Sequence, residues 1–337
     1  MIREIIAKLA DGQALTRAEA RGVMEEIMSG AATPAQIAAY ITALRLRGET
    51  AEIIAGSVEA MRARVTPVDA GGGVVVDVVG TGGDGRHTFN ISTAAAFVAA
   101  GAGAKVAKHG NRNVSSKCGS ADVLTALGVN IEQTPAQMGR CLREEGIAFL
   151  FAPLLHPAMK YAAGPRREIG IRTIFNILGP LTNPAGARHG LLGVYHPQLV
   201  SLIAKAAADL GAQRLFVVHG RDGMDEITIT DATLVAEVKD GAIREYEITP
   251  EQFGLARAPQ AALVGGTPEE NAVIVREILA GGRGPRRDIV LLNAAAAIAA
   301  AGLAADVAGA LPLAARSVDS GAAAEKLRRL VEITRAL

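Results

Sequence analysis

The sequence has no tryptophan, and aromatic residues make up only 3% of its 337 residues. Proteins that bind single-stranded nucleic acid usually stack the bases on aromatic side chains, so this composition argues against that function. An excess of charge of one sign is also missing, because 35 basic residues are balanced by 34 acidic residues. A net charge of +1 gives no general attraction for nucleic acid or for an anionic membrane. Any site for a polyanion must therefore arise from a local arrangement of residues.

Cysteine and long hydrophobic runs are scarce as well. Cys118 and Cys141 are too far apart in sequence for a Cys-x-x-Cys motif, and we expect free thiols in a reducing compartment. The N-terminal residues lack the basic and apolar regions of a secretory signal peptide. The alanine-rich run at residues 294–305, which has no charged or amide side chain, is too short to span a membrane and is predicted to be a buried helix. These absences together predict a cytoplasmic protein.

Residues 1–70 have the pattern of a small all-helical domain. Residues 16–19 read Thr-Arg-Ala-Glu, which is typical of a helix capping box. Thr33-Pro34 is typical of an N-cap residue followed by proline at the first helical position. Further helices are expected at 35–47 and 51–64. A segment of about residues 162–186, interrupted by glycine and proline, is expected to return to this helical domain.

From residue 73 to residue 337 the pattern changes to alternating short strands and helices. Apolar and β-branched segments predict strands near residues 74–79, 105–107, 147–151, 214–219 and 234–238. Alternation of this kind predicts an α/β domain with a mostly parallel sheet flanked by helices. The sequence thus predicts a small helical domain and a larger α/β domain.

The first predicted strand runs into Gly80-Thr81-Gly82-Gly83-Asp84-Gly85, followed by an alanine-rich helix that we expect Ser92 or Thr93 to cap. Glycines let backbone N–H groups approach an anion closely, and a helix N-terminus favours phosphate. The stretch also fits the Gly-x-Gly-x-x-Gly pattern of dinucleotide-binding folds, which need an acidic residue about twenty positions later. No Asp or Glu occurs between Asp84 and Asp122. The interval instead contains the basic residues Arg86, Lys105, Lys108, Arg112 and Lys117. This pattern predicts a polyphosphate site.

Two more polar segments follow predicted strands. Residues 108–116 follow the second strand, and the acidic pair Asp225-Glu226 comes after the strand at 214–219. Ligands of open α/β sheets bind at the carboxyl ends of the strands, so these segments should converge with the glycine loop. Paired carboxylates beside a polyphosphate are ligands for Mg²⁺, although surface turns also carry such pairs and Asp222 is a competing candidate. For His109, a structural hydrogen bond is as plausible as contact with a ligand. Arg112 and Lys117 could contact the ligand, but they could equally be ordinary solvent-exposed residues.

These residues resemble the anthranilate phosphoribosyltransferase family, and the resemblance covers essentially the whole chain. The matching motifs lie at residues 80–84, 90–93, 108–122, 155–160, 166–168, 179–184 and 319–321. The resemblance implies a nucleoside phosphorylase/phosphoribosyltransferase-like fold. It also implies transfer of a phosphoribosyl group from 5-phosphoribosyl 1-pyrophosphate to the amine of anthranilate, in tryptophan biosynthesis. A Mg²⁺ cofactor, with two ions per subunit, and a homodimer built through the helical domain are implied as well.

The resemblance also assigns site residues. Contacts with phosphoribosyl pyrophosphate are implied for Gly80, Gly83, Asp84, Thr88, Asn90, Ile91, Ser92, Thr93, Lys108, His109, Gly110, Asn111, Arg112, Asn113, Val114, Ser115, Ser116 and Ser120. Anthranilate contacts are implied for Gly80, Asn111 and Arg166, and metal contacts for Ser92, Asp225 and Glu226. A guanidinium group suits a substrate carboxylate, but from sequence Arg166 could equally be a surface arginine.

No Ser-His-Asp or Cys-His set is evident, and His109 is the one candidate for proton removal. Catalysis is therefore expected to depend on positioning and on electrostatic stabilisation of the pyrophosphate. Two alternatives remain at this point. A pyrimidine-nucleoside phosphorylase would use inorganic phosphate and need no paired carboxylates. A nucleic-acid-binding relative should have a basic surface and a degraded glycine loop, unlike this chain.

Overall fold

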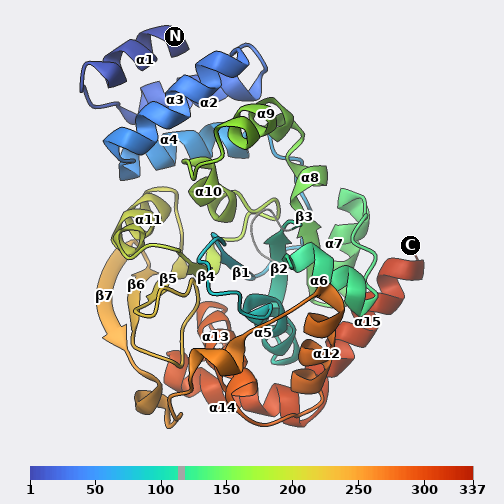
Figure 1. Cartoon of the computed structure of the whole chain (residues 1–337). Coiled ribbons are helices and arrows are strands. Elements are labelled where there is room, and N and C mark those ends of the chain that lie inside the picture. The colour runs from blue at the N-terminus through green and yellow to red at the C-terminus, as the bar shows by residue number, and fades with distance from the viewer. Residues whose placement is uncertain (113–117, 337) are drawn as a thin grey trace.

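The computed structural model describes residues 1–112 and 118–336. A group of helices lies at one end, and a larger part built on a sheet forms the rest (Figure 1). The first helices are α1 (Ile2–Ala10), α2 (Arg17–Met28), α3 (Pro34–Arg47) and α4 (Ala51–Arg62). Thr16 forms the expected capping box, Thr33 is the expected N-cap of α3 and also forms a capping box, and Thr50 caps α4. The local sequence therefore sets where these helices begin.

A second part of the chain packs on this helical group. It comprises α8 (Ala152–Leu155), η1 (Pro157–Met159), α9 (Lys160–Ile169), α10 (Phe175–Leu178) and η2 (Gly179–Leu181). Ala162 and Phe175 are buried in the same apolar cluster as Ile27 and Tyr40. Helix α11 (Gln198–Asp209) belongs to that cluster too, and it packs against both α4 and the sheet. The helical group is thus joined to the sheet by a continuous apolar core.

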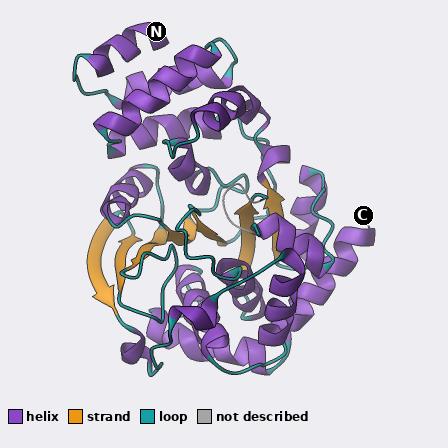
Figure 2. Cartoon of the chain, in the orientation of Figure 1, coloured by secondary structure: helices purple, strands orange, loops and turns teal. Residues whose placement is uncertain are grey.

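The described residues form a seven-stranded sheet in the order β3-β2-β1-β4-β5-β6-β7 (Figure 2). The strands are β1 (Val75–Gly80), β2 (Lys105–Gly110), β3 (Ile147–Phe151), β4 (His189–Gly193), β5 (Arg214–Gly220), β6 (Thr233–Lys239) and β7 (Ala242–Ile248). Pairing is parallel from β3 to β5 and antiparallel from β5 to β7. The predicted mostly parallel sheet with flanking helices is confirmed. The chain forms β2 and β3 on one side of β1 and then β4 to β7 on the other side. The strand order therefore reverses between β1 and β4, and folds of this kind bind ligands at that point, at the carboxyl ends of the strands.

Alanine-rich helices cover the sheet. Helix α5 (Ile91–Gly101) packs against α13 (Pro285–Ala300), and nearly all side chains of both are buried. The run at 294–305 therefore contributes a buried helix as far as Ala300, as expected, and its last residues form a turn. The other helices of this part are α6 (Ser120–Leu127), α7 (Pro135–Glu144), η3 (Pro250–Phe253), η4 (Gln260–Leu263), α12 (Pro268–Leu279), α14 (Val307–Asp319) and α15 (Ala322–Ala336). Within the described residues, no helix has the length and hydrophobicity needed to cross a membrane.

Candidate active site

The glycine loop after β1 lies at the carboxyl ends of β1 and β4, and the loop after β5 folds against it. The backbone N–H of Gly82 donates a 2.7 Å hydrogen bond to Oδ2 of Asp225. A Cβ at Gly80 would lie 2.5 Å from that same oxygen, and a Cβ at Gly193 would lie 1.6 Å from the Asp225 carbonyl oxygen. Both strand ends therefore require glycine because Asp225 packs directly on them.

Acidic side chains gather at this point. Glu226 is buried and Asp225 is partly buried, and the Asp225 backbone N–H donates to Oδ2 of Asp84 at 3.4 Å. Burial, and then the charge of Asp84, raises the pKa of Asp225 from 3.8 to about 7. Burial, and then Asp225, raises the pKa of Glu226 from 4.5 to about 8. Buried carboxylates that repel one another in this way favour a bound cation.

Lys108 on β2 supplies a positive charge beside these carboxylates. Its buried Nζ donates to the Val78 carbonyl at 2.6 Å and to the Ser92 hydroxyl at 3.2 Å. Burial lowers the pKa of Lys108, while the charges of Asp77, Glu226 and Asp225 act in the opposite direction. The glycine loop, Lys108 and the acidic pair, which lie far apart in sequence, therefore share one site.

Helix α5 begins beside the acidic pair, and its first turn differs from the expectation. Asn90 is the N-cap residue and makes no side-chain cap, so the expected cap by Ser92 or Thr93 is wrong. The Ser92 backbone N–H donates to Oε1 of Glu226 at 3.1 Å, and its hydroxyl faces Lys108. The side chains of Ile91 and Thr93 are buried in the protein, which leaves backbone groups as their means of contacting a ligand.

The donor atoms of this site fit a magnesium ion that shares its ligands with a phosphate. Among the described residues, no group of three or more His, Cys, Asp or Glu side chains is arranged as a metal site by itself. Mg²⁺ does not need such a cage, because it keeps waters and usually takes one or two protein carboxylates plus substrate phosphate oxygens. Asp225, Glu226 and the Ser92 hydroxyl provide oxygen donors of this kind. Asp222 does not compete, because its carboxylate accepts hydrogen bonds from Met224, Thr228 and Thr230 within its own loop.

The second loop is described only at its two ends. The Asn111 carbonyl accepts from the Ala121 backbone at 3.2 Å and from the Ser120 hydroxyl at 3.3 Å, which joins the loop to α6. Arg112 is half exposed and lies 3.4 Å from Asp122, which also caps α6 by accepting from Gly119. The predicted contacts at Asn113, Val114, Ser115 and Ser116, and the candidate Lys117, lie outside the described residues.

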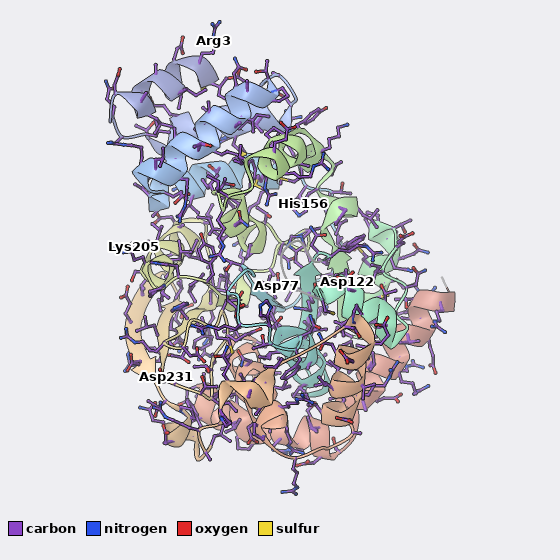
Figure 3. The ribbon with its side chains drawn as sticks, viewed as in Figure 1. Arg3, Asp77, Asp122, His156, Lys205 and Asp231 are labelled. Carbon is purple, nitrogen blue, oxygen red and sulfur yellow. The ribbon has the colours of Figure 1, made fainter. Side chains whose placement is uncertain are left out.

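A histidine pair lies next to this loop. Nε2 of His109 is 3.1 Å from Nε2 of His156. His156, labelled in Figure 3, lies in the matching motif at 155–160, but sequence reasoning assigned it no role. Burial lowers the pKa of His109 to about 3 and that of His156 to about 4, so both rings are neutral near pH 7. A ring with so low a pKa is a weak base, and its main contribution is a fixed hydrogen-bonding surface.

Arg166 on α9 differs from its neighbours in burial. Arg167 and Glu168 are exposed, whereas Arg166 is partly buried, with its guanidinium group 5.3 Å from the centre of the Phe175 ring. Burial lowers the pKa of Arg166, and in the described part of the chain no acidic side chain pairs with it. A partly buried cation without a counter-ion is suited to a carboxylate ligand.

Further residues tie the returning segment to the sheet, and sequence reasoning assigned them no role, although Asn183 lies in the matching motif at 179–184. The Arg172 guanidinium donates to the Gly83 carbonyl and lies 4.4 Å from the centre of the Tyr195 ring. Nδ2 of Asn183 donates to Oδ2 of buried Asp77 at 2.7 Å, and burial raises the pKa of Asp77 to about 6. Their partners are 89 and 106 positions away in sequence, so no local pattern indicated these contacts.

The chain matches known proteins over nearly its full length. Residues 3–65 match the model of a family described as "Glycosyl transferase family, helical bundle domain", and residues 72–324 match "Glycosyl transferase family, a/b domain". The chain is 58% identical to an anthranilate phosphoribosyltransferase of Moorella thermoacetica, over 98% of both chains. It is also 58% identical to one from Anaeromyxobacter dehalogenans (strain 2CP-C), over 99% of both chains.

Solved structures agree with these relatives. The crystal structure of an anthranilate phosphoribosyltransferase from Thermus thermophilus superposes with a TM-score of 0.93 at 45% identity, covering 98% of this chain and 99% of that one. The Saccharomyces cerevisiae enzyme in complex with phosphoribosyl pyrophosphate and Mg has a TM-score of 0.90 at 29% identity, covering 100% and 98%. The same yeast enzyme with 4-fluoroanthranilate has a TM-score of 0.90 at 28% identity, with the same coverage.

Proposed function

The chain belongs to the anthranilate phosphoribosyltransferase family, and we propose that it performs that family's reaction at the site between β1, β2, β4 and the loop after β5. The reaction joins the phosphoribosyl group of 5-phosphoribosyl 1-pyrophosphate to the amine of anthranilate and releases pyrophosphate, in tryptophan biosynthesis. The observation that supports this site most strongly is the convergence of Gly82, Lys108 and Asp225. Family membership also sets aside the nucleoside phosphorylase and nucleic-acid-binding alternatives.

The phosphates of the donor substrate are assigned to the glycine loop, the start of α5 and the second loop. Backbone N–H groups in the glycine loop and at the helix N-terminus provide donors for phosphate oxygens. The residues we assign to this role are Gly80, Gly83, Asp84, Thr88, Asn90 to Thr93, Lys108 to Ser116 and Ser120. Of these, Lys108 carries a positive charge that is already buried, so it is poised to interact strongly with an anion.

Mg²⁺ is assigned to Asp225, Glu226 and Ser92, with two ions per subunit and with Asp84 close by. When bound, Mg²⁺ would neutralise the charge that develops on the departing pyrophosphate. The support from this chain is the raised pKa of both Asp225 and Glu226, because these carboxylates are costly to ionise without a cation. The support from relatives is the yeast enzyme, which was crystallised with Mg.

Anthranilate is assigned to Arg166, Asn111 and Gly80. Arg166 would bind the carboxylate of the substrate and orient the ring, and Gly80 would border both substrates. An aromatic amine is already neutral near pH 7, so it can attack the ribose C1 without a strong base. The neutral His109–His156 pair agrees with this, because neither ring is basic enough to be required for activation. Catalysis then depends on holding the amine, the sugar and the leaving group in line.

The test is consumption of fluorescent anthranilate, measured with and without phosphoribosyl pyrophosphate and Mg²⁺. The wild-type protein should consume anthranilate only when both are present. The double variant Asp225→Asn/Glu226→Gln should lose roughly 100-fold or more in turnover, as expected when electrostatic stabilisation of a leaving group is removed. Circular dichroism should show that it stays folded.

The exposed substitution Glu245→Gln is the matched control and should leave activity unchanged. Wild-type dependence on Mg²⁺ in the double variant would refute the metal assignment. A wild-type protein that is inactive with both substrates and Mg²⁺ would refute the proposed function.

A further inference from the structure

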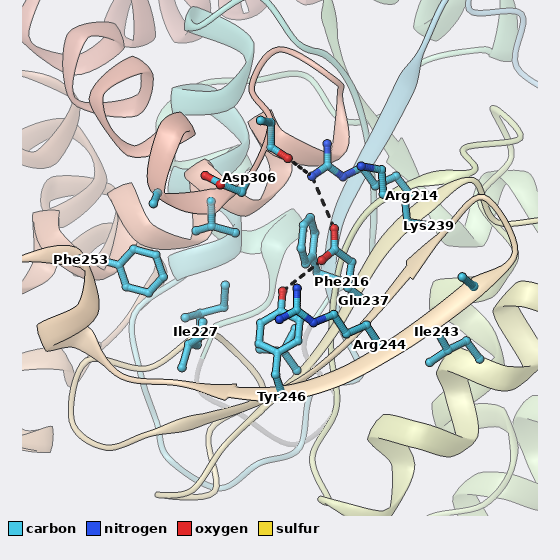
Figure 4. A pocket seen from close by; sticks show the side chains of 16 residues that line it. Arg214, Phe216, Ile227, Glu237, Lys239, Ile243, Arg244, Tyr246, Phe253 and Asp306 are labelled. Atoms are coloured by element: carbon cyan, nitrogen blue, oxygen red, sulfur yellow. Dashed lines mark hydrogen bonds and ion pairs between the residues drawn. The ribbon is translucent and has the colours of Figure 1, made fainter.

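A cavity of about 450 Å³ lies outside the proposed transferase site, against the antiparallel half of the sheet (Figure 4). Strands β5, β6 and β7 form one side, and the start of α14 forms another. We call it the β6–β7 cavity. Cavities of a few hundred Å³ are large enough to bury a small molecule. It shares none of its lining residues with the residues assigned to the two substrates or to Mg²⁺.

The inner surface of the β6–β7 cavity is apolar and partly aromatic. Phe216, Phe253 and Tyr246 line it together with Ile227 and Val235. Phe216, Ile227 and Val235 are almost completely buried, so they form a fixed surface rather than mobile side chains. Such walls favour a ligand with a flat apolar body, because aromatic rings pack well against one another.

Arg214 is the main polar group of the cavity. It is only 8% exposed, and its Nη2 donates to the Ala305 carbonyl at 2.6 Å and lies 3.4 Å from Oε1 of Glu237. Its Nε is buried and has no hydrogen-bond partner in the described residues. A buried N–H donor without an acceptor is unfavourable.

The N-terminus of α14 adds a second set of donors. Asp306 is the N-cap residue, and its carboxylate accepts from the Gly309 backbone at 2.8 Å. Val307 and Ala308 also line the cavity, and within residues 1–112 and 118–336 their backbone N–H groups have no hydrogen-bond acceptor. Free N–H groups at the positive end of a helix dipole favour an anion.

The charged groups around the cavity also favour an anionic ligand. Arg214, Lys239 and Arg244 are basic, whereas Glu237 and Asp306 are acidic. The Glu237 carboxylate is already engaged by Arg214 and by the Tyr246 hydroxyl at 3.2 Å. The Asp306 carboxylate is engaged by the helix that it caps. The basic side chains that line the cavity therefore outnumber the acidic ones by three to two.

We propose that the β6–β7 cavity is a second ligand site, which binds a small aromatic carboxylate. The aromatic ring lies against Phe216 and Phe253, and the carboxylate accepts hydrogen bonds from Arg214 and from the start of α14. Ile227, which lines the cavity, is the next residue in sequence after Glu226, one of the proposed metal carboxylates. Asn293 fixes Ile227 through hydrogen bonds to its backbone N–H and carbonyl, at 2.9 and 2.8 Å.

The experiment is a titration of the full-length protein with 4-fluorophenylacetate, followed by ¹⁹F NMR. The wild-type protein should bind this probe, and Arg166→Ala should bind it equally well, because Arg166 belongs to the transferase site. Ala308→Trp places a large side chain in the cavity from an exposed position of α14 and should weaken binding about tenfold or more. Arg214→Gln should weaken it by a similar factor, because a charge-assisted hydrogen bond is lost.

The matched control is Ala280→Trp, which adds the same side chain at an exposed position outside the cavity and should bind like the wild type. Thermal unfolding of Ala308→Trp should match that of the wild type, and this variant decides the test if Arg214→Gln does not fold. No binding to the wild type at about 10 mM probe would overturn the proposal. Undiminished binding to Ala308→Trp would also overturn it, and so would loss of binding in Arg166→Ala, which would place the probe in the transferase site.

Discussion

Replacing Glu226 by Gln should make the metal-free protein more stable near neutral pH, even though it removes a residue of the active site. The pKa of Glu226 rises from 4.5 to about 8 because the side chain is buried and lies near Asp225. Between those values the native state binds more protons than the unfolded chain, so stability falls as the pH rises. At about 1.4 kcal/mol per pKa unit, the loss from Glu226 alone is about 2 kcal/mol between pH 5 and pH 7.

A glutamine at this position stays neutral and can still accept the hydrogen bond from the Ser92 N–H. Urea unfolding at pH 5, 6, 7 and 8 in the presence of EDTA measures the effect. The free energy of unfolding of Glu226→Gln should exceed that of the wild type by a margin that widens with pH. The exposed variant Glu245→Gln should follow the wild-type curve. Parallel curves for Glu226→Gln and wild type, or a less stable variant at pH 7, would show that Glu226 is not a strained carboxylate.

Other predictions test the substrate, core and assembly assignments. In steady-state kinetics, Arg166→Ala should raise the KM for anthranilate about 10- to 100-fold, because one charge-assisted contact is lost, and should change the KM for phosphoribosyl pyrophosphate little. The exposed control Arg167→Ala should change neither KM. Asn183→Ala should lower the free energy of unfolding by about 2 kcal/mol in urea titrations, because Asp77 and a backbone carbonyl of β2 lose a buried donor. Light scattering should give the mass of a dimer, and Leu46→Lys should shift it toward the monomer if the helical group forms the interface, since Leu46 is 81% exposed there.

The strands that the sequence predicted contain short, mostly buried apolar runs with at least one β-branched residue, and the two that it missed lack this signal. Strand β4 reads His-Gly-Leu-Leu-Gly, without a β-branched residue, and is stabilised by pairing with β1 and β5. Its Gly190 is required by the neighbouring strand, because a Cβ there would lie 2.2 Å from the Asp77 carbonyl oxygen. Strand β7 is a mostly exposed edge strand with several charged residues. A signal for β7 was present, since Asp240-Gly241 forms the tight turn of a hairpin with β6.

The parts of the site that the sequence predicted are continuous motifs at strand ends. The glycine loop and the acidic pair each have a local composition that indicates their chemistry, and the alternation of strands and helices places both at the same edge of the sheet. The contacts of Arg172 and His156 could not be predicted in this way, because each joins segments far apart in sequence. The burial that separates Arg166 from Arg167 also depends on the packing of α9, which its sequence does not specify.

The charges of the site imply that Mg²⁺ and phosphoribosyl pyrophosphate bind together rather than independently. When ionised, Asp84, Asp225 and Glu226 carry three negative charges, and Lys108 supplies one positive charge among them. A pyrophosphate group that arrived alone would be repelled by the remaining negative charge, and a metal ion that arrived alone would lack phosphate oxygens to complete its coordination. Mg²⁺ thus supplies the positive charge that pyrophosphate binding needs, and pyrophosphate supplies oxygen ligands for Mg²⁺. Because linkage is reciprocal, Mg²⁺ should strengthen binding of phosphoribosyl pyrophosphate by the same factor by which phosphoribosyl pyrophosphate strengthens binding of Mg²⁺.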